Sequence, residues 1–139
     1  MSYLDTRQAL LTKLAAAALV PSTSIAYENK SFDPSGLSIW LSPFFIPATD
    51  GIMGKTSGSR NEHRGIFQVS VYVSKNATNF DSDQLDKIDD IISEFSYGSS
   101  ATYSAQTVEV LESTVNGGRE SESWYVRDIS INYLTFSVR

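Results

Sequence analysis

The feature that most constrains the fold is the stretch RGIFQVSVYVSK at residues 64–75, in which apolar residues recur at every second position. Successive side chains of a β-strand point to opposite faces of the sheet. The predicted inward set is Phe67, Val69, Val71 and Val73, and the opposite set is Ile66, Gln68, Ser70, Tyr72 and Ser74. The stretch therefore predicts a long strand with one face in a core and the other partly exposed to water.

Two segments, residues 2–19 and 82–95, instead repeat their apolar residues at three- and four-residue steps, which predicts amphipathic helices. In the first, Ser2 and Asp5 are placed as a cap and its partner, and Pro21 follows the expected end. The predicted buried stripes are Leu4, Leu11, Leu14, Ala15 and Ala18 in the first helix, and Leu85, Ile88, Ile92 and Phe95 in the second.

Two short strands are predicted between the first helix and the long strand, at residues 24–29 and 37–45. A turn through Pro34 and Gly36 joins them. Within the second of these strands Pro43 has no amide hydrogen to donate, which predicts either a sheet edge or the end of the strand.

A long hairpin is predicted at the end of the chain, from residues 102–114 through Asn-Gly-Gly at 116–118 to residues 122–139. In its last strand Ile129, Ile131 and Tyr133 share one face, whereas Leu134, Phe136 and Val138 share the other. Either a bulge near Tyr133 or burial of the two strand ends on different faces explains this switch.

The order helix, three strands, helix and two-strand hairpin predicts an α+β fold. We expect a mixed, mostly antiparallel sheet of about five strands with two helices packed on one face. Because the chain has 139 residues, we expect one domain over residues 1–139, with a flexible loop at about 47–63. The last strand has no charged residue between Asp128 and Arg139, so we expect it to be an unguarded sheet edge available for assembly.

Composition excludes several classes of function. A net charge of −5 opposes tight binding of nucleic acid, because phosphate contacts depend on Lys and Arg. Cysteine is absent, which excludes a disulfide framework, a thiol nucleophile and cysteine-ligated zinc. The alanine-rich run at residues 14–20 is too short to span a bilayer and has no basic segment ahead of it, so we expect a soluble intracellular protein without a membrane partner.

The stretch DGIMGKTSGSR at residues 50–60 contains Gly54, Lys55 and Thr56 in a row, as a phosphate-binding loop does. The upstream glycine of that motif falls on Thr49, however, and no apolar period follows to begin a helix. A helix N-terminus is what such a loop uses to hold phosphate. We therefore interpret the stretch as a solvated loop that orders against a partner.

His63 is the single histidine, between Glu62 and Arg64. The sequence has no G-x-S-x-G elbow or other nucleophile motif for it to serve, which favours a surface histidine over a catalytic one. The aromatic residues Trp40, Tyr72, Trp124 and Tyr125 lack interleaved Lys and Arg. They are therefore predicted as core or sheet-face residues, not as a platform for stacking bases.

Aspartates cluster at the start of the second helix and along it, at positions 81, 83, 86, 89 and 90. The glycine and the terminal Glu of a calcium-binding loop are missing, so no metal site is predicted. Asp86 and Asp90 share one helical face, where like charges repel. We interpret the cluster as a solvated face, or as a surface facing something that must not adhere to it. No catalytic residue and no cofactor is predicted.

The order of segments resembles the tail terminator, or tail completion, proteins of long-tailed bacteriophages over nearly the whole chain. The shared features are Asn29, Phe32 and Pro34 around a Phe-x-Pro turn, the strand motif Arg64, Gly65, Phe67 and Val69, and Phe95 at a helix end. The resemblance implies a homohexameric ring on the head-proximal end of the tail tube. Such a ring stops tube polymerisation, contacts the tail tube protein and offers a surface to head-completion or connector proteins.

The resemblance also implies a location at the head–tail junction of the virion, after synthesis in the host cytoplasm, with DNA passing the lumen without specific binding. The acidic balance suits such a lumen, because negative walls repel the duplex. We expect the acidic helix face or the 50–62 loop to contribute to the lumen or to the tube contact. The candidate assembly residues are Lys55, Arg60, His63, Arg64, Asp86, Asp90, Tyr133, Phe136 and Arg139.

Two alternatives to this structural role stay open. One is a small ligand-binding or regulatory α+β module without catalysis, whose loop around Gly54 closes on a ligand. The other, less favoured, is a hydrolase or NTPase, which would lose turnover when Lys55 is replaced by Ala.

Overall fold

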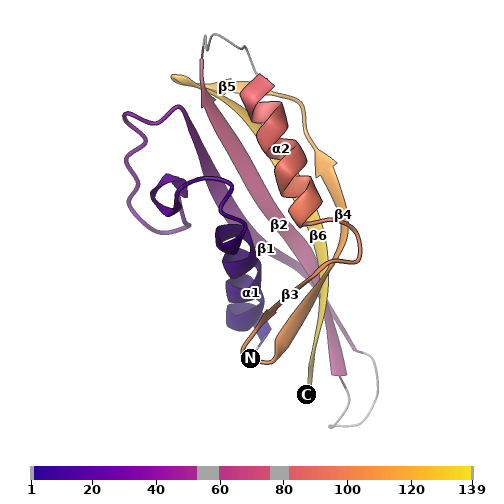
Figure 1. Ribbon diagram of the computed structural model, residues 1–139. Coiled ribbons are helices and arrows are strands. Elements are labelled where there is room, and N and C mark those ends of the chain that lie inside the picture. The colour runs from indigo at the N-terminus through magenta and orange to yellow at the C-terminus, as the bar shows by residue number, and fades with distance from the viewer. Residues whose placement is uncertain (1, 53–59, 76–81, 139) are drawn as a thin grey trace.

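The computed structural model describes residues 2–52, 60–75 and 82–138. The elements in chain order are α1 (Ser2–Ala16), the 3₁₀ helix η1 (Ser22–Ser24), β1 (Ile39–Ile52), β2 (Arg60–Ser74), α2 (Ser82–Glu94), β3 (Ser100–Tyr103), β4 (Gln106–Val115), β5 (Arg119–Ser121) and β6 (Trp124–Val138). The fold is α+β, as predicted: two helices and a long, twisted antiparallel sheet (Figure 1).

The sheet follows the order β1-β2-β6-β4-β3, and β5 pairs with one end of β6. All of these strand pairs are antiparallel. The long strand predicted from the alternating pattern is β2, which pairs with β1 on one side and β6 on the other. Its odd-numbered apolar residues from Phe67 to Val73 are buried, and Ile66 and Tyr72 on the other face are half-buried, as predicted.

Both helices lie on one face of the sheet, because residues of each belong to the same core as the odd-numbered residues of β2. Leu10 and Leu14 come from α1, and Ile88 and Ile91 come from α2. The strand residues of this core are Leu41, Phe67, Val69, Val71, Ala101, Val108, Val110, Ile129, Ile131 and Tyr133. Figure 1 shows α1 beside β1 and α2 along β2.

The first helix ends at Ala16, three residues before the predicted end, and Ala18 has a φ of +52°. Its buried face also differs from the predicted one. Leu14 is buried, but Leu4 is exposed, and the side chains that pack inward include Thr6 and Ala9. The prediction was wrong because the apolar residues of this helix, which include the consecutive Ala9, Leu10 and Leu11, do not fall on one face, so their spacing does not select the buried side.

The second helix was predicted to within one residue of its observed end, but its buried stripe is rotated. Ile91 is fully buried while Leu85 is 41 % exposed, and Ile92 is half-buried. The reason is Gln84, a polar residue with no exposed surface, whose amide group contacts backbone carbonyls of two strands. With Gln84 directed inward to these carbonyls, the adjacent Leu85 is turned outward.

The predicted strand at 24–29 is wrong. Residues 22–24 form η1, and Ile25 makes one isolated parallel bridge with Leu41. The turn that follows does form, since the Asp33 carboxylate accepts hydrogen bonds from the backbone N–H (3.0 Å) and hydroxyl (2.8 Å) of Ser35. β1 is an edge strand in the described sheet, as the missing donor at Pro43 predicted.

The end of the chain holds four strands, not two. A tight turn at Ser104 and Ala105, both with positive φ, joins β3 to β4. The Asn-Gly-Gly segment at 116–118 does not reverse the chain, because β4 and β5 both run antiparallel to β6. The reversal occurs at Glu122, whose φ is +55°. A Cβ at Gly118 would overlap the ring of Tyr125, so a larger residue there would have to displace that side chain.

The prediction that the last strand is an unguarded edge is wrong, because β6 lies in the middle of the sheet between β2 and β4. The lack of charged residues in it reflects pairing on both sides. Its inward side chains alternate regularly from Ile129 to Thr135, so no switch of face occurs there. A bulge does lie near Tyr133, but in β4, between Val110 and Ser113.

The strands also extend into the predicted 47–63 loop. β1 continues to Ile52 with a register shift between Pro47 and Thr49, and β2 begins at Arg60. Residues 53–59 lie outside the described residues. Both ends of the segment predicted as a loop, residues 47–52 and 60–63, are therefore paired strand.

Candidate functional site

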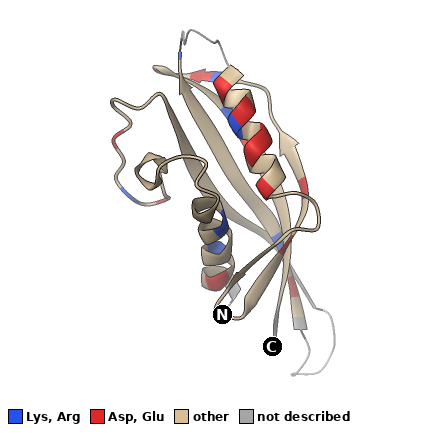
Figure 2. Cartoon of the chain, viewed as in Figure 1, with Lys and Arg blue, Asp and Glu red and all other residues tan. Residues whose placement is uncertain are grey.

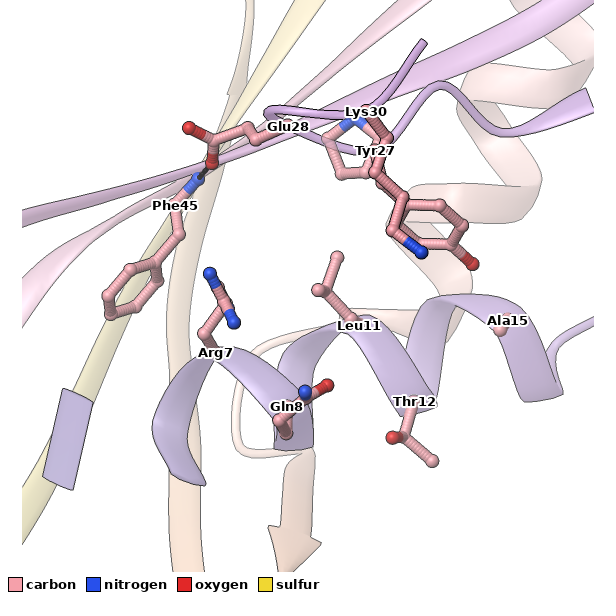
Figure 3. A pocket seen from close by; sticks show the side chains of 10 residues that line it. Arg7, Gln8, Leu11, Thr12, Ala15, Tyr27, Glu28, Lys30 and Phe45 are labelled. Carbon is pink, nitrogen blue, oxygen red and sulfur yellow. Dashed lines mark hydrogen bonds between the residues drawn. The ribbon is translucent and has the colours of Figure 1, made fainter. Parts of the chain in front are cut away.

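A groove with a volume of about 320 Å³ runs between α1 and the edge of β1. Its apolar floor includes Leu11 of α1 and Phe45 of β1, and Tyr27 lies on the segment that approaches the strand (Figure 3). The helix presents to the groove the stripe formed by Arg7, Gln8, Leu11, Thr12 and Ala15. Of these residues Leu11 also packs against the core, and the other four are not core residues.

The segment beside the groove also covers the exposed edge of β1. The Glu28 carboxylate accepts a hydrogen bond from the Phe45 amide at 2.6 Å, and the Ala26 amide donates to the Leu41 carbonyl at 2.8 Å. Between these positions Pro43 has no amide to offer. An unpaired strand edge is a template for adding another chain, so these contacts oppose strand addition at residues 41–45 of β1.

Two cations, Arg7 and Lys30, line the same groove, and both side chains are exposed. Figure 3 shows Arg7 extending from α1 into the open space of the groove. Neither forms an ion pair with a carboxylate in residues 2–52, 60–75 or 82–138. The groove thus combines apolar walls with two positive charges that the described chain leaves available.

A second charged surface lies on α2, whose aspartates are shown in red in Figure 2. Its members are Asp83, Asp86, Asp89 and Asp90, all exposed. Within the described chain none of these carboxylates forms an ion pair. The neighbouring Lys87 forms no ion pair with them in the described parts of the chain, and its ammonium group donates to the backbone carbonyl of Leu19. We call these four residues the acidic face of α2.

His63, expected at the surface, is buried with 7 % of its area exposed. It lies on the inner face of β2, opposite Thr135 of β6, and its ring packs edge-on against Tyr3 of α1 at 5.9 Å. The expectation was wrong because the N-terminus of α1 covers this end of the sheet. His63 therefore contributes to packing between the helix and the sheet.

Tyr133 is also buried, at 1 % exposure, and stacks on Phe45 with ring centroids 5.6 Å apart. It faces Gly65 across the β2–β6 pair. A Cβ at Gly65 would lie 2.5 Å from the Tyr133 hydroxyl oxygen and 2.6 Å from the Ile46 carbonyl oxygen. The glycine of the Arg-Gly-x-Phe strand motif is thus explained by close packing, and Tyr133 offers no surface for assembly.

The remaining candidate assembly residues do not gather at one place. Arg64 is exposed and pairs with Glu62 next to it, and Phe136 is half-buried opposite Glu62 on β6. Asp86 and Asp90 lie on α2 and line a different hollow. Lys55 and Arg139 lie outside the described residues, and Arg60 is described only as the first residue of β2.

The aromatic residues predicted to lie on the sheet do so. Trp40 stacks on Tyr72 at 3.8 Å with the rings nearly parallel, and Trp124 meets Trp40 edge-on at 5.7 Å. Phe32 covers Trp40 from the turn before β1. Trp40, Tyr72 and Trp124 occupy even-numbered positions of β1, β2 and β6. Their side chains therefore pack together on the sheet face opposite the helices.

Among the described side chains no group of three or more His, Asp or Glu is placed to hold a metal ion. No helix in the described ranges is both long and apolar enough to cross a membrane. The Asp33 carboxyl has its pKa held below the ordinary value of 3.8, because the backbone amide and then the hydroxyl of Ser35 donate to its charged form.

Sequence reasoning missed the groove because its walls are distant in the chain. The stripe on α1 was visible as polar residues at helical spacing, which could have marked a second, exposed face. Nothing local predicts that Tyr27, Glu28 and Lys30 cross the edge of β1. That contact depends on the path of the chain between η1 and β1.

The fold and these surfaces define a small α+β protein with a sheet edge covered at residues 41–45 and two charged surfaces, the groove lined by Arg7 and Lys30 and the acidic face of α2. The model of the phage tail terminator protein family matches residues 5–133, and the chain belongs to this family. It is therefore a structural protein of bacteriophage tails that interacts with other tail components.

A solved structure has a similar fold, with a TM-score of 0.72 and 20 % identity over 94 % of this chain and 92 % of that chain. At this identity the likeness shows the fold alone. No curated protein matches the sequence.

Proposed function

We propose that this protein caps the head-proximal end of the tail tube as a homohexameric ring, ends tube polymerisation and provides the surface to which head-completion proteins attach. The observation that carries the proposal is the family match over residues 5–133. In this role residues 1–139 act as one structural domain at the head–tail junction, without a catalytic step or a cofactor.

The charge of the chain supports this role. A net charge of −5 disfavours adhesion of DNA to the ring, and DNA has to pass through its lumen. A closed ring of identical subunits joined head to tail needs two different surfaces on each subunit that complement one another. The cationic groove beside α1 and the acidic face of α2 are two surfaces of opposite charge.

The test is the length of tails in a phage lysate made without this protein, measured by negative-stain microscopy. We expect overlong tubes without heads, and tails of normal length once the purified protein is present during assembly. Tails of normal length in the deficient lysate would contradict the proposal. A Lys55→Ala variant should restore tail length as well as the wild type does, because nucleotide hydrolysis has no part in this role.

One observation favours a second candidate, a small ligand-binding module. The groove volume of about 320 Å³ falls at the lower end of the usual range for ligand pockets. A ligand that fills the groove should raise the melting temperature in proportion to the logarithm of its concentration. A thermal-shift screen of small carboxylates and phosphates on the wild-type protein tests this alternative, with the Arg7→Ala variant as the control. A compound that binds in the groove should raise the melting temperature of the wild type more than that of the variant.

A further inference from the structure

We propose that neighbouring copies of this chain contact each other by placing the acidic face of α2 of one copy in the groove beside α1 of the next. This inference rests on the proposed ring, and it names the two surfaces through which the ring closes. It moves the α2 aspartates from the lumen or tube contact, where the sequence suggested them, to the contact between subunits.

The groove has the chemistry to hold acidic side chains. Arg7 and Lys30 are exposed within it and form no ion pair in the described parts of the chain. The one carboxylate in the lining, Glu28, accepts a hydrogen bond from the Phe45 amide and keeps its negative charge, so Arg7 and Lys30 leave the lining with a net positive charge. Leu11, Tyr27 and Phe45 add apolar contact area around the charges. Such walls strengthen charge pairing because they exclude water.

The acidic face of α2 complements this groove. Asp86 is one helical turn from Asp83 and from Asp90, and residues at such spacing lie about 5–6 Å apart on a helix surface. Two carboxylates can therefore enter the groove from one side of the helix. Like charges at this spacing also destabilise the isolated helix. Cations from a neighbouring subunit would offset that repulsion and so stabilise the helix in the assembled ring.

The two surfaces cannot meet within one copy. α1 turns its other side toward α2, where the Lys13 ammonium group lies 3.6 Å from the Glu94 carboxylate. The stripe that carries Arg7 points instead to the groove at the edge of β1 (Figure 3). Because the groove and the acidic face lie apart in one copy, the groove of one copy can pair only with the acidic face of another. This is the head-to-tail arrangement of a ring.

Strand addition is a poor alternative at the same place. Glu28, the Ala26 amide and Pro43 already occupy or remove the hydrogen-bonding groups of the β1 edge. A partner at this edge therefore has to bind through side chains in the groove. A helix 13 residues long offers about 20 Å of surface for such a contact.

The experiment uses charge reversal on each surface. The groove variant carries Arg7→Glu and Lys30→Glu, and the helix variant carries Asp86→Lys and Asp90→Lys. A matched control, Glu109→Lys with Glu122→Lys, changes the charge of the chain as much as the helix variant does, on exposed positions of β4 and the β5–β6 turn. Circular dichroism verifies that every variant is folded. Ring formation is measured by native mass spectrometry alone and by microscopy on tail tubes.

We expect the fraction of protein in rings to fall at least tenfold in each charge-reversed variant. The control should form rings as the wild type does. An equimolar mixture of the groove and helix variants should regain a ring that alternates the two chains, because each reversed surface then meets its reversed complement. The chain with all four substitutions should also assemble by itself. This recovery cannot arise from a folding defect.

The outcomes separate this contact from the ring itself. Wild-type protein that stays monomeric both alone and on tubes would overturn the ring and this contact with it. A wild-type ring that both reversed variants also form would overturn only the contact. Variants that form rings but no longer cap tubes would place these charges at the tube contact and refute the pairing proposed here. Variants that form no rings, either alone or in the equimolar mixture, would refute it as well.

Discussion

Replacement of Gln84 is the sharpest test of how α2 is held on the sheet. Its amide nitrogen donates to the Val71 carbonyl at 2.9 Å and to the Tyr125 carbonyl at 3.1 Å, and its oxygen accepts from the Arg127 Nε at 3.0 Å. One side chain thus joins the helix to β2 and β6. We expect Gln84→Met, which keeps the length of the side chain, to remove all three hydrogen bonds without opening a large cavity.

The expected loss follows from these bonds. Each neutral bond contributes about 1 kcal/mol to the free energy of unfolding and the bond from the charged guanidinium contributes about 1.5 to 2 kcal/mol. Arg127 is half-buried and regains part of its loss from water. The net loss is therefore about 3 kcal/mol, which corresponds to a fall in melting temperature of roughly 10 °C for a domain of this size.

Urea unfolding monitored by circular dichroism measures the change at a protein concentration low enough to keep the chain monomeric. Leu85→Met is the matched control, because Leu85 is the next residue of the same helix but is 41 % exposed. The control should lose less than about 0.5 kcal/mol. If Gln84→Met were as stable as this control, the hydrogen bonds would not be what fixes the rotation of α2.

Three further perturbations test other parts of the structure. Gly65→Ala should cost about 1–3 kcal/mol in urea unfolding because its Cβ has no room, whereas Gly117→Ala, with open space around it, should change stability little; equal losses would contradict the packing argument. Glu28→Ala should increase aggregation measured by light scattering, because it frees the Phe45 amide at the sheet edge, and Glu28→Gln should not; unchanged scattering in the Ala variant would refute the guarding role. The folded-state pKa of Asp33 is lowered, so the stability that its carboxylate contributes is present above the unfolded value near 3.8 and is lost as pH falls through the folded value; an NMR titration that finds a pKa at or above 3.8 would contradict this.

Much of the secondary structure was predictable because its signals are local. The alternation in residues 64–75 predicted β2, and the three- and four-residue steps predicted both helices. Boundaries held to within three residues for α1 and one for α2. Predictions failed where a partner from elsewhere decides the outcome. Residues 24–29 form no strand because they reach only one bridge with Leu41.

The candidate site was less predictable than the fold. Asp86 and Asp90 are exposed on α2, as their polarity indicated, but His63 and Tyr133 are buried. Both face the core because their strands alternate in register with the buried residues around them. The sequence around His63 gives no sign that the N-terminal end of α1 covers this side chain.

The periodicities and the order of segments can be recognised from neighbouring residues, and the acidic balance from the composition alone. The central position of β6 and the groove that Arg7 and Lys30 share depend on contacts between distant segments, which the folded chain alone reveals. The physical reason is that strand order and helix rotation minimise unsatisfied backbone and buried polar groups over the whole chain. No single segment holds the information on which partner will satisfy it.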